Sequence, residues 1–110
     1  SINIYISNKV NNKSLILDIV SGIEEESVLY ETFIVDEKDA TDLAFSAASE
    51  SVLEVGVGVD SKGSLVVHYK KLPPDKPLFK INYNINIDDV RSTCSNAARL
   101  VKGTPFIINK

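Results

Sequence analysis

The segment Val52–Tyr69 restricts the possible folds of this chain more than any other feature. Val52–Val59 is an apolar run, which is typical of a central strand buried on both faces of a sheet. The tight-turn sequence Asp60-Ser-Lys-Gly63 follows directly, and Ser64–Tyr69 has a second strand pattern. Two strands joined by so short a turn must run antiparallel. The segment therefore predicts a buried β-hairpin.

The residues before this hairpin alternate between strand and helix patterns. We expect a strand at Ile2–Ile6, a helix at about Lys13–Glu26, a strand at Val28–Val35 and a second helix that begins after Asp36 or Asp39. Strands separated by helices pair in parallel, and their crossovers are right-handed. The first strand should therefore lie between the second and the third.

The residues after the hairpin complete the sheet and add a third helix. A proline-rich loop, Leu72–Pro77, leads to a fifth strand at Leu78–Tyr83. Asn86 or Asp88 is expected to cap the last helix, which ends at Gly103. The sequence thus predicts one α/β domain over residues 1–110. Its fold class is a three-layer α/β/α arrangement of three helices and a mixed five-stranded sheet, with order 2-1-3-4-5 and strand 4 antiparallel.

Composition and charge exclude several classes of protein. The net charge of −3 argues against nucleic-acid binding, because neutralising phosphates requires a basic surface. No apolar segment is long enough to cross a bilayer, so we expect no membrane association. The single cysteine, Cys94, has no partner for an intrachain disulfide, which favours the reducing cytoplasm.

The sequence offers no catalytic or cofactor-binding residues. His68 falls within a predicted strand, and Cys94 falls on the apolar face of the last helix, where a thiol behaves as a small hydrophobic group. The turn from the first strand into the first helix contains no glycine, although phosphate-binding turns of α/β proteins usually do. Gly56 and Gly58 lie inside a strand, where they are expected to let a helix pack closely on the sheet.

The acidic run Glu24-Glu25-Glu26 is unfavourable where it is predicted, at the C-terminal end of a helix. One interpretation is a solvated surface; the other is a cation or basic partner that offsets the repulsion. The helical period directs Glu25 away from the apolar face, so Glu25 is the residue best placed to meet such a partner.

The last helix carries four polar or basic residues away from its apolar face, Arg91, Asn96, Arg99 and Lys102. They are too few for nucleic acid, and either a solvated face or a contact with another protein would account for them.

Several segments, spread from the first helix to Phe106, resemble one known family. They are Gly22-Ile-Glu-Glu-Glu26, Val66-Val-His-Tyr-Lys70 with Leu72-Pro73, Pro77-Leu-Phe79, and Asn96-Ala-Ala-Arg-Leu-Val-Lys-Gly103 with Pro105-Phe106. In this order they resemble the small (beta) subunit of the reactivating factor for B12-dependent diol and glycerol dehydratases.

The resemblance implies a non-catalytic accessory subunit of a bacterial, cytoplasmic complex. Its partner would be an ATPase-like large subunit that binds ATP or ADP, with two copies of each subunit. The complex releases damaged cobalamin from an inactivated dehydratase. The small subunit acts as a placeholder on the large subunit and is exchanged for the dehydratase. Whether the client is a diol or a glycerol dehydratase, and whether the system lies in a microcompartment, are left open.

The resemblance also implies a site. In the family, the middle glutamate of the acidic triplet reaches a divalent ion, such as Mg²⁺, held by the large subunit. Here that residue is Glu25, with Glu24 and Glu26 beside it at the partner interface. No cofactor would be bound by this chain alone.

Two departures from the family and two rival interpretations remain. The family commonly has glycine where this chain has Ser27 and Cys94. The medium subunit of the dehydratase contains a similar domain, with the same acidic triplet and patterns such as Ser61-Lys-Gly63 and Leu72-Pro-Pro74. His68-Tyr-Lys70 and the short loop before Leu78 favour the reactivating factor. A small-molecule binding protein is the alternative from another class.

Overall fold

The computed structural model describes residues 1–108 as three layers. The central layer is a five-stranded sheet of order β2-β1-β3-β4-β5. The strands are β1 (Ile2–Ser7), β2 (Tyr30–Val35), β3 (Val55–Val59), β4 (Ser64–Tyr69) and β5 (Phe79–Asn82). β1 pairs in parallel with β2 and β3, whereas β4 is antiparallel to both β3 and β5. The predicted mixed sheet and its strand order are confirmed.

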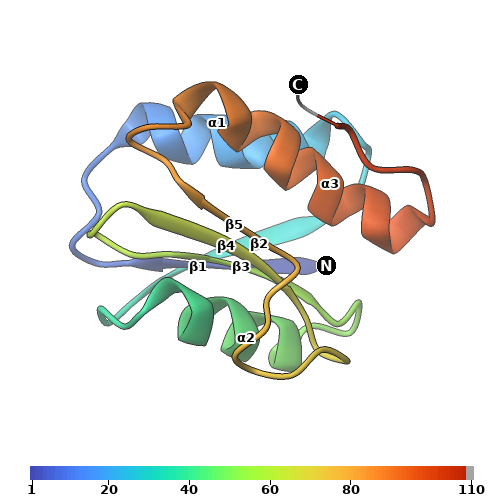
Figure 1. Ribbon diagram of the computed structural model, residues 1–110, viewed down its shortest axis with the longest axis horizontal. Helices are drawn as coiled ribbons and strands as arrows, with labels where there is room; N and C mark the ends of the chain where they lie inside the picture. Colours follow the sequence, from blue (N-terminus) through green and yellow to red (C-terminus); the bar gives the residue numbers. More distant parts are fainter. Residues whose placement is uncertain (109–110) are drawn as a thin grey trace.

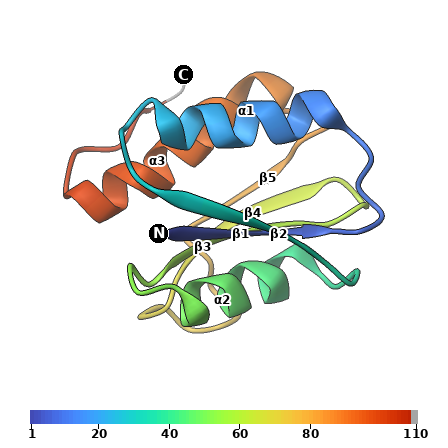
Figure 2. The ribbon, with the colours of Figure 1, turned by 180° about the vertical axis from the view of Figure 1, so that it is seen from behind.

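Three α-helices cover the two faces of this sheet. They are α1 (Lys13–Glu24), α2 (Ala40–Glu50) and α3 (Val90–Lys102), the last preceded by the short 3₁₀ helix η1 (Ile87–Asp89). The helices α1 and α3 lie side by side on one face, and α2 covers the other (Figures 1 and 2). None of the helices in residues 1–108 combines the length and apolarity needed to cross a membrane.

The starts and ends of the helices follow local capping chemistry. The Asn12 side chain accepts a hydrogen bond from the Leu15 amide, and Asp39 does the same for Thr41. Both residues satisfy amides that a helix leaves unpaired at its first turn. Gly103 ends α3 with a left-handed backbone, φ 70°, as the sequence predicts. The expected side-chain cap of the last helix is absent, because η1 precedes α3 and Asp89 makes no capping bond.

Two predicted boundaries differ from the structure, by two and by three residues. The helix expected to reach Glu26 ends at Glu24, and the strand expected from Val52 starts at Val55. In each case a residue with positive φ interrupts the element nearby: Ser27 at 59° and Glu54 at 63°. Val52 is consequently 88% exposed, in the turn that follows α2.

The two faces of the sheet are packed differently. The main core lies between the sheet and the α1–α3 pair and consists of large aliphatic side chains. On the other face, the alanines of α2 lie against Gly56 and Gly58 of β3. A Cβ added at Gly56 would lie 2.2 Å from the Ala48 nitrogen, and one at Gly58 would lie 2.2 Å from the Ala40 oxygen. The prediction that these glycines allow close helix packing is therefore confirmed.

Candidate functional site

The acidic triplet lies where α1 passes close to α3. A Cβ added at Gly22 would meet the Arg91 carbonyl oxygen at 2.3 Å and the Cys94 Cβ at 3.1 Å. Gly22 is thus needed for the backbones of the two helices to approach. This approach brings the polar side of α3, far along the chain, beside residues 24–26.

Glu26 is held inside the protein by three groups of α3. Its carboxylate accepts hydrogen bonds from the Ser95 hydroxyl at 2.9 Å, Arg99 Nε at 3.0 Å and Lys102 Nζ at 3.0 Å. Its side chain is only 10% exposed. The bonds from Lys102 and Ser95, reinforced by Arg99, lower the pKa of Glu26 from 4.5 to about 2 despite partial burial. Glu26 therefore ties the end of α1 to α3.

Glu25 points outward and forms an ion pair with the Nε of Arg91. Both side chains are about half exposed, at 48% and 54%. An ion pair in contact with solvent is weak, because water and salt screen it. The Glu25 carboxylate can therefore exchange Arg91 for a stronger cation without leaving a buried charge behind.

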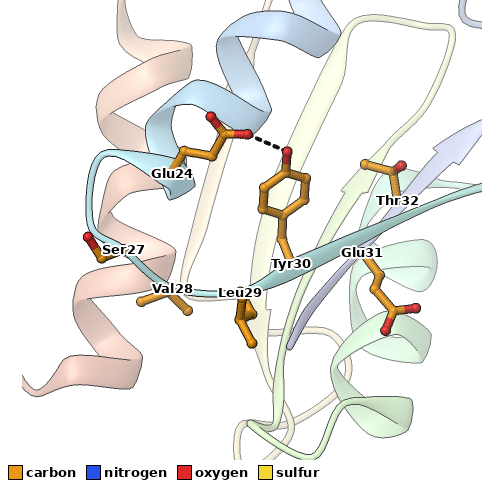
Figure 3. A pocket seen from close by; sticks show the side chains of 7 residues that line it. All are labelled: Glu24, Ser27, Val28, Leu29, Tyr30, Glu31 and Thr32. Carbon is orange, nitrogen blue, oxygen red and sulfur yellow. Dashed lines mark hydrogen bonds between the residues drawn. The ribbon is translucent and has the colours of Figure 1, made fainter.

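Glu24 turns toward β2 and accepts a hydrogen bond from the Tyr30 hydroxyl. This bond, together with partial burial, raises the pKa of Tyr30. Glu24 and residues 27–32 line a shallow hollow between the end of α1 and the start of β2 (Figure 3). The hollow connects the acidic triplet to the first edge strand of the sheet.

The three carboxylates thus have three different surroundings. The expected outward direction of Glu25 agrees with its exposure, but its neighbour Arg91 was not anticipated. All four polar residues of α3 bind the acidic triplet or the segment that follows the helix. Asn96 is 5% exposed and bonds both to the Ile107 amide and to its carbonyl oxygen. Neither interpretation offered for them, a solvated face or a contact with another protein, included this internal role.

The remaining chemistry-bearing side chains do not form a site. His68 lies under α2, with its ring against Phe45 and hydrogen-bonded to the carbonyl oxygen of Pro74. Cys94 belongs to the core on the opposite face of the sheet, where burial raises its pKa to about 12. The sheet separates the two residues. Within residues 1–108, no group of three histidine, cysteine, aspartate or glutamate side chains is arranged to hold a metal ion.

Known proteins resemble this chain over nearly its whole length. The sequence model of the dehydratase medium subunit family matches residues 1–107. The propanediol dehydratase-reactivating factor small subunit of Citrobacter freundii is 47% identical over 92 residues, which cover 81% of this chain and 76% of that protein. The equivalent protein of Salmonella typhimurium is 44% identical over 93 residues, with 84% and 79% covered.

Two solved structures share the fold. A chain of a glycerol dehydratase reactivase superposes with a TM-score of 0.91 at 29% identity and covers 97% of this chain and 96% of its own length. A chain of diol dehydratase-reactivating factor complexed with ADP and Mg²⁺ gives 0.87 at 36% identity, with 98% and 97% covered.

Proposed function

Because this chain belongs to the dehydratase medium subunit family, among the small subunits of dehydratase-reactivating factors, we propose that it is the non-catalytic small subunit of such a factor. In this role it binds an ATPase-like large subunit in the bacterial cytoplasm, with two copies of each subunit. It occupies the surface that the large subunit needs for an inactivated, B12-dependent dehydratase. The large subunit hydrolyses ATP, exchanges this chain for the dehydratase and releases the damaged cobalamin.

The observation that carries this proposal is the combined similarity of sequence and fold. Identity of 47% and 44% extends over more than three quarters of two reactivating-factor small subunits. The similarity of the fold extends over 96% of a reactivase chain. A domain of the dehydratase medium subunit is less favoured, because the two relatives described above are small subunits of reactivating factors.

We further propose that Glu25 binds a divalent ion held by the large subunit. The residues fit this role. Glu25 offers one exposed carboxylate, and its counter-ion Arg91 is equally exposed. Mg²⁺ prefers oxygen ligands and usually takes only one or two carboxylates from the protein around it. A single carboxylate supplied across an interface meets that requirement, whereas Glu26 is already saturated by α3.

Co-expression with the ATPase-like large subunit of a dehydratase-reactivating factor tests the function. The two proteins should co-elute in size-exclusion chromatography as a complex with two copies of each. Absence of co-elution with ADP, with ATP and without nucleotide would refute the proposal.

Glu25→Gln tests the metal contact. The amide preserves the shape but removes the anionic ligand, so the complex should weaken in Mg²⁺ by at least tenfold and lose its sensitivity to chelator. Glu24→Gln is the matched comparison: it removes a neighbouring carboxylate that already bonds to Tyr30, so the complex should keep its Mg²⁺ dependence. Arg91→Gln should preserve the Mg²⁺ dependence, because it removes only a competing cation. Unchanged affinity for Glu25→Gln, together with a large loss for Glu24→Gln, would show that the metal contact had been assigned to the wrong residue.

A further inference from the structure

The two edges of the sheet differ in how they are protected. The edge at β5 has only four residues, includes Lys80, and is partly covered where Phe106 packs against Phe79 with ring centroids 5.2 Å apart. Short length, lysine and covering segments are common ways to prevent an edge from pairing with another chain. The edge at β2 has six residues, with no lysine or proline among them.

β2 is also little covered by the helices, since its four middle residues are exposed. Phe33, on the α2 side, is 39% exposed, and Ile34, on the α1 side, is 66% exposed. Leu29, just before the strand, is 80% exposed. In Figure 2, β2 (teal) runs along the near edge of the sheet, with α1 above and α2 below. Apolar side chains exposed together on an open edge are typical of an interaction surface.

The backbone groups that β2 leaves free can be assigned from its pairing with β1. The carbonyl oxygens of Leu29 and Val35 accept hydrogen bonds from the amides of Ile2 and Asn8. Because successive residues of a strand face opposite neighbours, residues 29, 31, 33 and 35 face β1. The amides and carbonyl groups of Tyr30, Thr32 and Ile34 therefore point outward, in the geometry that another strand requires.

The charge around this edge indicates what kind of strand would pair with it. Three hollows flank β2, and the charged side chains that line them are four carboxylates and one lysine: Glu24, Glu31, Asp36, Glu50 and Lys38. In Figure 3, Leu29 and Glu31 point to one side of the strand, and Tyr30 and Thr32 point to the other. Pairing with a second copy of this chain would bring two such acidic surroundings together, whereas a basic strand would neutralise them.

We propose that β2 is the docking edge for an extended segment of the large subunit that carries lysine or arginine side chains, and that this segment continues the sheet as a sixth strand. The inference rests on the proposed function and adds the surface through which the partner is held. The hollow lined by Glu24 and residues 27–32 makes this edge continuous with the acidic end of α1. Strand addition supplies affinity through backbone hydrogen bonds, and the acidic side chains select the partner by charge.

Amide hydrogen exchange of the isotope-labelled chain, alone and bound to the large subunit, measures the predicted bonds directly. The amides of Thr32 and Ile34 should exchange rapidly in the free chain and slow by at least tenfold in the complex. The amide of Phe33, which faces β1, should already be protected in the free chain. A complex that forms without added protection at Thr32 and Ile34 would overturn the edge proposal and leave the proposed function standing.

Two variants and one control provide the second test. Thr32→Pro removes an outward amide, and Glu31→Lys reverses one of the charges that line the hollows beside β2. Each variant should weaken the complex at least tenfold. Circular dichroism should show that each variant remains folded. Asp75→Lys makes the same charge reversal in the loop before β5 and should change affinity less than twofold. Equal affinity of the three variants for the large subunit would overturn the edge proposal. So would a dimer of the wild-type chain that Thr32→Pro abolishes while binding of the large subunit is unchanged. A wild-type chain that does not bind the large subunit at all would overturn the proposed function as well.

Discussion

Replacing Glu26 by glutamine should destabilise this protein in a pH-dependent way. The amide keeps the size of the side chain but leaves Arg99 and Lys102 without their common anion. A carboxyl whose pKa falls on folding from 4.5 to about 2 stabilises the folded state at neutral pH by at most about 3 kcal/mol. Since Arg99 and Lys102 are 27% and 39% exposed, solvent screening reduces the expected loss to about 2 kcal/mol.

The pH dependence follows from the direction of this pKa change. The pKa of Glu26 is lower in the folded state, so its contribution is complete above about pH 4.5 and disappears as the pH falls toward 2. Urea unfolding of both proteins at pH 7, 4 and 2.5 should give a difference that is largest at pH 7 and shrinks steadily. Glu25→Gln, which removes only an exposed ion pair, should change stability by less than about 0.5 kcal/mol. A Glu26→Gln difference that is absent at pH 7, or that stays constant down to pH 2.5, would refute this account of the network.

Three further predictions concern the helix contact, the strained turn and nucleotide binding. Gly22→Ala should lower the free energy of unfolding by at least about 2 kcal/mol in urea, because its Cβ would lie 2.3 Å from the Arg91 carbonyl oxygen; a change below 0.5 kcal/mol would contradict this tight packing. Ser27→Gly should raise the midpoint of thermal unfolding and stabilise the fold by about 0.5–1 kcal/mol, because φ at this position is 59°; Ser27→Ala is the control that should not stabilise. The isolated chain should bind neither Mg-ATP nor Mg-ADP, since the turn between β1 and α1 has no glycine, and calorimetric titration that detects micromolar binding would show this to be wrong.

The arrangement of the sheet was predictable from local sequence. A four-residue turn between two strand patterns requires an antiparallel pair, and right-handed crossovers place β1 between β2 and β3. The end of α1 was not predictable in the same way. It depends on Ser27 adopting a left-handed backbone, which serine adopts only when the surrounding structure requires it.

The acidic triplet was recognised from its unfavourable position, but its partners within the chain were not. Arg91, Arg99 and Lys102 lie more than sixty residues away in sequence. They reach the triplet only because Gly22 lets α1 approach α3. The available signal had three parts: the uncompensated acidic end of α1, the glycine at position 22 that allows close packing, and the basic residues of α3, which the fold places on the same face of the sheet.

Exchange of this chain for the dehydratase is the most direct test of the central claim. The complex with the large subunit would be mixed with a dehydratase that retains cobalamin without its adenosyl group, in Mg²⁺ and with ATP, ADP or neither, and then separated by size-exclusion chromatography. The placeholder role predicts that this chain elutes free as the large subunit moves to the dehydratase, with cobalamin released in the same nucleotide condition. Release of cobalamin while this chain stays on the large subunit would contradict the account.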